Sequence, residues 1–154
     1  MGLYTDFEIE ITLKKNTPEH VINIIDYLFN WRRNDRKEKS ELIKPNHEFF
    51  KTPRWHHIGS MSGWSDAESN FNPKTLHIKS ISSLKNYDDE IDLFLDWIKP
   101  HLQCQDGDMI GTQWCECEES ETVLIYTEGT AKEGAHVQTQ GLPTVVNRQN
   151  KTGT

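Results

Sequence analysis

The chain has 154 residues, a formal net charge of −7 and 34% hydrophobic residues, and it contains five Trp, six Phe and four Tyr. This length suits one domain with its own apolar core, and the aromatic content is unlike that of disordered chains. The acidic balance argues against nonspecific binding to nucleic-acid phosphates, because that binding depends on clustered Lys and Arg.

The first element is a predicted strand over residues 3–13. Apolar and small side chains alternate there with charged ones, and the charged set includes Asp6, Glu8 and Glu10. Such alternation is typical of a strand with one buried face. A helix is predicted next, with Thr17 as its N-cap, Pro18 at its first position and its end near Arg33. Its apolar face consists of Val21, Ile24, Ile25, Leu28 and Phe29.

Four strands and one helix are predicted in the rest of the folded part. Residues 55–61 and 76–82 are expected to form two strands joined by a polar loop, and a second helix is expected to begin near residues 86–89 and to end at Pro100. This helix presents Ile91, Phe94, Leu95 and Ile98 on one side. Residues 109–118 and 121–128 are predicted to form a closing hairpin.

The resulting order, β-α-β-β-α-β-β, predicts an α+β two-layer sandwich: a mainly antiparallel five-stranded sheet with two helices on one face. A single domain is expected over residues 1–128, followed by a flexible polar tail over 129–154. The open face of the sheet would carry Asp6, Glu8 and Glu10. The closing hairpin would add either Trp114, Glu116 and Glu118 or the opposite set with Cys115 and Cys117, because a shift of one residue exchanges the two sets.

Two surfaces are candidate binding sites. One is the loop-rich middle with Trp55, His56, His57, Trp64 and Asp66, because Trp is typical of interface hot spots and loops often carry function. The alternative for this segment is that Trp55 turns inward and covers a sheet edge. The other surface is the acidic strand face with Glu8 and Glu10, whose alternative role is solubility and protection of the sheet edge.

Neither a metal site nor a cofactor is predicted. The His set (His47, His56, His57 and His77) and the set of Cys104, Cys115, Cys117 and His101 both lack the spacings of known zinc sites. The sequence also lacks the G-x-S-x-G, P-loop, G-x-G-x-x-G, H-E-x-x-H and C-x-x-C motifs. A non-enzyme is therefore favoured over an enzyme, although the motifs alone do not decide the question.

Three Cys and an N-terminus without a signal-peptide pattern favour the cytoplasm, and no apolar stretch is long enough to cross a membrane. The segments Gly2-Leu3-Tyr4-Thr5-Asp6, Thr17-Pro18-Glu19 and Asp106–Gly111 resemble small uncharacterised proteins of bacteriophages and other mobile elements. The resemblance implies a bacterial cell or an infected host, and it brings no known active site.

The leading hypothesis is a non-catalytic interaction protein, an accessory or inhibitor of a mobile element that binds a host macromolecule, with a protein as the expected partner. The alternative is a small metal-dependent hydrolase or nucleotide-binding enzyme that uses the His/Trp-rich loop. A homodimer formed through the open sheet is a third possibility.

Overall fold

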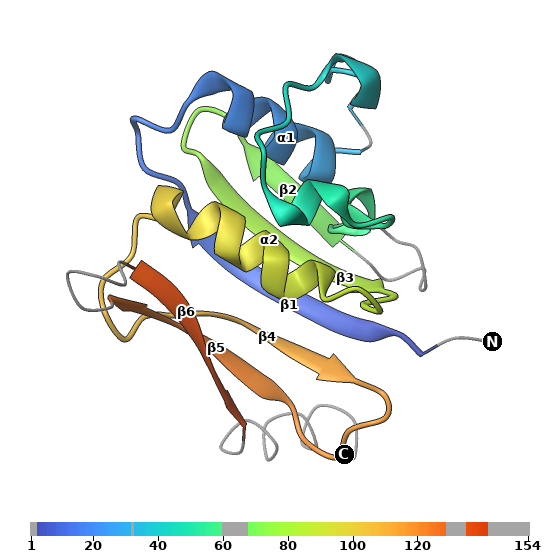
Figure 1. Cartoon of the computed structure of the whole chain (residues 1–154). Coiled ribbons are helices and arrows are strands. Elements are labelled where there is room, and N and C mark those ends of the chain that lie inside the picture. The colour runs from blue at the N-terminus through green and yellow to red at the C-terminus, as the bar shows by residue number, and fades with distance from the viewer. Residues whose placement is uncertain (1–2, 32, 60–67, 129–134, 142–154) are drawn as a thin grey trace.

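The computed structural model describes residues 3–31, 33–59, 68–128 and 135–141 (Figure 1). The α-helices and strands follow in the order β1 (Thr5–Thr12), α1 (Glu19–Phe29), β2 (Glu68–Asn72), β3 (His77–Leu84), α2 (Glu90–Ile98), β4 (Met109–Cys115), β5 (Thr122–Glu128) and β6 (Ala135–Gly141). Short 3-10 helices lie in the connections: η1 (Lys39–Glu41), η2 (Glu48–Lys51), η3 (Trp55–His57) and η4 (Lys99–His101).

The strands form one sheet in the order β2-β3-β1-β4-β5-β6, and all neighbouring strands are antiparallel. The predicted α+β class, with an antiparallel sheet and two α-helices, is confirmed. The described sheet has six strands where five were predicted, because β6 pairs with β5. This strand comes from the segment that the sequence assigned to a tail. Its residues are mostly polar, and main-chain pairing of a polar segment leaves no apolar periodicity in the sequence.

Strand β1 lies at the centre of the sheet, between β3 and β4. Phe7, Ile9 and Ile11 are almost completely buried, as the alternation predicts. Asp6 and Glu8 on the opposite side are half-buried, and Glu10 is exposed. β1 therefore separates an apolar face from an acidic one.

Both α-helices lie over the same face of the sheet (Figure 1). Each buries the apolar residues predicted for it, and α2 also buries Glu90 and Trp97. The rings of Phe29 in α1 and Phe94 in α2 are 5.9 Å apart, so the two helices share one core. The predicted N-cap is wrong, because the Thr17 hydroxyl donates to the carbonyl oxygen of Lys14 at 2.6 Å and no side chain caps α1.

Phe49 of η2 connects the long segment after α1 to the helical layer. Its side chain is fully buried, and its ring centroid lies 5.5 Å from that of Phe94 and 5.8 Å from that of Trp97. Phe50 and Trp55 contact the same ring at 4.9 and 6.0 Å. A segment with little regular structure is thus fixed by aromatic packing.

The prediction of a strand over residues 55–61 is wrong. Residues 55–57 form the 3-10 helix η3, and the edge strand β2 begins only at Glu68. Trp55 and Ile58 are buried, at a spacing of three rather than two, which suits a 3-10 turn. Strand β2 was missed because four of its five residues are polar and only Phe71 is buried.

Replacing Phe49 by Ala should lower the free energy of unfolding by about 3–5 kcal/mol, because it leaves a cavity among four aromatic rings. Phe50→Ala is the matched control: Phe50 is only partly buried, so its loss should cost clearly less. Urea unfolding followed by Trp fluorescence measures both values. Equal losses in the two variants would contradict the central role of Phe49.

Candidate binding surface

The open face of the sheet carries a row of carboxylates along β1. Glu8 lies opposite Ile81 of β3 and Thr112 of β4, and Glu10 lies opposite Lys79. Residues directly opposite each other in antiparallel strands point to the same face. Since Glu68 of β2 also lies opposite Ile81, this acidic face extends to the edge of the sheet.

The register of the closing hairpin is settled by its pairing with β1. Trp114 lies opposite Asp6, whereas Cys115 lies opposite the buried Thr5. Trp114 therefore belongs to the acidic face, and Cys115 does not. For Trp114 and Cys115 this is the first of the two registers left open by the sequence, whereas Glu116 and Glu118 lie beyond the end of β4.

A groove of about 280 Å³ crosses β3, β1 and β4 on the acidic face. Apolar side chains line part of it: Ile81 is 41% exposed and Met109 is 58% exposed. The polar lining includes Glu8, Glu10 and Lys79. Ile81 was not among the predicted site residues. It shares the outward positions of β3 with His77 and Lys79, so the alternation of this strand could have identified it.

Gly111 brings β4 close to β1 at the floor of the groove. A Cβ atom at this position would collide with the main-chain carbonyl oxygen of Glu8, so a larger residue would force the two strands apart. The pairing of β4 with β5 shifts register between Met109 and Gly111. Irregularities of this kind re-aim neighbouring side chains, and Met109 stands exposed beside this one.

Trp55 does not present its ring to solvent. Its side chain is 4% exposed and contacts the rings of Phe49, Phe50 and Tyr27. Lys39 and Lys44 place their Nζ atoms 5.7 Å from the ring centroid. Trp64 and Asp66, the other predicted site residues near it, lie outside the described residues.

His56 and His57 follow Trp55 and are half-buried. Partial burial, with the positive charge of Lys39 and the proximity of His57, lowers the pKa of His56 to about 4. Burial and Arg54 also lower the pKa of His57. Both rings are therefore neutral at pH 7.

His47 and His77, the other two histidines considered as metal ligands, have hydrogen-bond partners of their own. His47 Nε2 lies 2.8 Å from Asp96 Oδ2, and its Nδ1 accepts a hydrogen bond from the main-chain N–H of Phe49. His77 lies between Glu10 and Thr12, at 3.0 Å from each. In the described ranges these histidines do not converge on one point with two further metal ligands.

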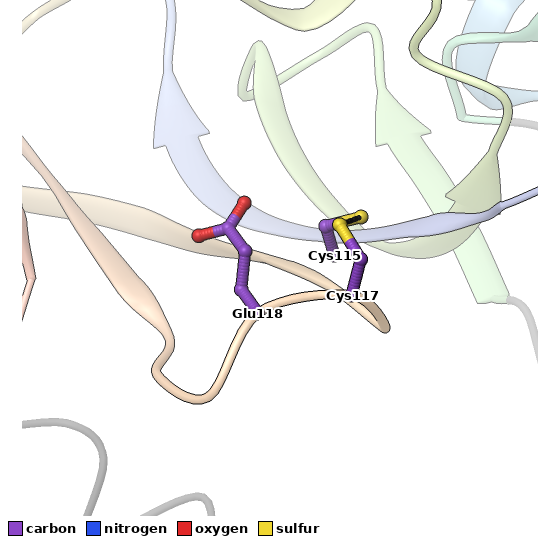
Figure 2. A group of neighbouring side chains, drawn as sticks. All are labelled: Cys115, Cys117 and Glu118. Carbon is purple, nitrogen blue, oxygen red and sulfur yellow. Dashed lines mark hydrogen bonds between the residues drawn. The ribbon is translucent and has the colours of Figure 1, made fainter.

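Cys115, Cys117 and Glu118 do converge, at the turn between β4 and β5 (Figure 2). The two sulfur atoms are 2.6 Å apart, and the ligand atoms of all three residues lie within 4.8 Å of one another. The hydrogen bond with Cys115, together with the carboxylate of Glu118, raises the pKa of Cys117. Glu118 was not part of any predicted metal set, and neither Cys104 nor His101 belongs to this group.

The lowered pKa of His56 predicts a pH effect on stability. The unfolded chain binds a proton to this ring below about pH 6.5, whereas the folded chain does so only near pH 4. The stabilisation is therefore complete above pH 6.5 and is lost as the pH falls towards 4. Because the ring is partly exposed, the loss should be on the order of 1 kcal/mol.

His56→Gln should flatten this part of the curve of unfolding free energy against pH, and an NMR titration of the ring should give the pKa directly. Lys39→Gln is a matched variant that should raise the His56 pKa. It should therefore narrow the pH range over which the unfolding free energy changes. An unchanged slope in His56→Gln would contradict the assignment.

The described ranges contain no helix that is both long and apolar enough to cross a membrane. No family model, no curated protein and no solved structure matches this chain. The side chains described above are therefore the basis for assigning a function.

Proposed function

We propose that the chain is a non-catalytic interaction protein that docks a basic segment of a partner protein onto its acidic sheet face. The single observation that carries this proposal is the groove beside Glu8 and Glu10, on the side of the sheet opposite the two α-helices. The accessory or inhibitor role in a mobile element belongs to the same proposal and rests on the resemblance of three short segments. The odd number of Cys supports a reducing compartment such as the cytoplasm.

The charge of the face favours a basic partner. Asp6, Glu8, Glu10 and Glu68 share it, and Lys79 lies opposite Glu10. Complementary charge raises association rates and excludes partners of the wrong sign. A second copy of this chain would bring like charges together, so a homodimer through this face is disfavoured.

Besides the carboxylates, apolar side chains in the groove would contact the partner segment. Ile81 and Met109 expose apolar surface beside the carboxylates, and exposed apolar groups gathered within a polar rim are typical of binding sites. A partner segment with alternating basic and apolar residues matches this pattern. Trp55 offers less for binding, because its ring is already buried in the core.

Charge reversal tests the proposal. Glu8→Lys with Glu10→Lys should weaken binding of a short fluorescent peptide of alternating Lys and Leu by about tenfold or more. The control pair, Glu19→Lys with Glu48→Lys, changes the net charge equally but lies in α1 and η2, so it should leave the affinity nearly unchanged. Fluorescence anisotropy at two salt concentrations measures both.

A loss of affinity in both pairs would mean that the peptide senses only net charge, and it would contradict docking on the sheet face. Glu8→Gln with Glu10→Gln guards against misfolding, because the shape is kept and only charge is removed. A photo-crosslinking residue at Ile81 should capture the peptide, while the same residue at Ile43, which is 73% exposed in the connection after α1, should not.

A further inference from the structure

We propose that Cys115, Cys117 and Glu118 form a binding site for a thiophilic divalent cation of the zinc class. The three side chains rise on the same side of the turn after β4 (Figure 2). Their ligand atoms lie within 4.8 Å of one another, so small side-chain rotations would bring them to the spacing of donors around one ion. Thiolates at about 2.3 Å from a tetrahedral zinc ion lie about 3.8 Å apart, so the two sulfurs need only a small side-chain rotation to separate from 2.6 Å.

The donor set has the right chemistry for such an ion. Two thiolates and one carboxylate are common zinc ligands, and three protein ligands leave the fourth position to water. On binding, the two S–H bonds break, two sulfur–metal bonds form and two protons pass to solvent. No oxidant or reductant is needed, since neither sulfur changes its oxidation state.

Hydrogen bonds hold the turn in the conformation that gathers the ligands. The main-chain N–H of Glu118 donates to the carbonyl oxygen of Cys115 at 2.8 Å, and Trp114 Nε1 donates to the carbonyl oxygen of Glu118 at 3.0 Å. These bonds fix the spacing between the first and the last ligand. The metal would therefore bind to a turn that is already formed, which lowers the entropy cost of binding.

A second pair of contacts ties the turn to the central strand. The main-chain N–H of Tyr4 donates to Glu116 Oε1 at 3.2 Å, and the main-chain N–H of Glu116 donates to the carbonyl oxygen of Tyr4 at 3.3 Å. The carboxylates of Glu116, Glu118 and Glu119 also give the turn a negative potential that attracts a cation.

Cys104 provides an internal control for thiol chemistry. It is half-buried and packs against the core, and burial together with Asp108 raises its pKa. It does not belong to the convergent group. If the cation binds at the turn, its affinity should therefore not change when the Cys104 thiol is removed.

The test is a titration of the full chain with Cd²⁺, kept reduced by a phosphine without thiols. Native mass spectrometry should show a single Cd²⁺ per chain, and the sulfur-to-metal charge-transfer absorbance should saturate at the same ratio. Cys115→Ser and Cys117→Ser should each abolish the absorbance at that ratio, whereas Cys104→Ser should retain it. Glu118→Gln should weaken binding by roughly tenfold or more. An excess of Zn²⁺ should compete with Cd²⁺ for the same site.

Several outcomes would overturn the proposal. The proposal is overturned if the reduced wild-type protein binds no Cd²⁺. This holds even if Cys115 and Cys117 form a disulfide once the reductant is removed. Loss of binding in Cys104→Ser to the same extent as in Cys115→Ser would show that thiols, and not this turn, attract the ion. If Glu118→Gln binds Cd²⁺ with the affinity of the wild-type protein, the Glu118 carboxylate is not a ligand. None of these results bears on docking at the acidic face.

Discussion

The side chains of β1 point alternately into two different environments, and the rest of the molecule is arranged around that strand. Phe7, Ile9 and Ile11 form the floor of the core beneath both α-helices, while Asp6, Glu8 and Glu10 stand on the opposite face. Because β3 and β4 pair with β1 on either side, its register also decides which of their residues join each face. The register between β1 and β3 places Ile81 opposite Glu8 and Lys79 opposite Glu10, and these four residues line the groove.

Cations and carboxylates are mixed on the helical side of the sheet, where Arg33 pairs with Asp26 and Lys99 pairs with Asp96. Several cations on the helical side lie over aromatic rings: Arg36 over Tyr27, Lys39 over Trp55 and Arg54 over Tyr87. On the other side of the sheet, Asp6, Glu8, Glu10 and Glu68 share one face with Lys79, so carboxylates outnumber lysines among these five residues. An excess of one charge sign on a protein face steers oppositely charged molecules before contact. The neutral state of His56 comes first from its partial burial and then from Lys39, whose Nζ lies 3.4 Å from the ring's Nδ1.

Regular elements with strong periodicity could be predicted from the sequence. The alternation of β1 and the apolar faces of α1 and α2 each repeat at one clear period, and they gave the correct class and the correct buried residues. Segments held by main-chain pairing or by irregular packing could not. Strands β2 and β6 are largely polar, and Trp55 is buried by a 3-10 turn that looks like a strand in the sequence. For the candidate sites, the acidic row was accessible to sequence analysis. The convergence of Glu118 with two cysteines was not, because it depends on the shape of a turn.

The position of β1 in the sheet has a consequence for synthesis. Thr5 lies opposite Leu84 on one side and Cys115 on the other, so β1 leaves the ribosome well before either of its partner strands. An unpaired strand with one apolar face is a template for joining other nascent chains, and the risk grows with the waiting time. Carboxylates at every second position oppose such pairing, because two copies would bring like charges face to face. The same carboxylates that line the groove in the folded protein therefore place like charges on the strand while it is still unpaired.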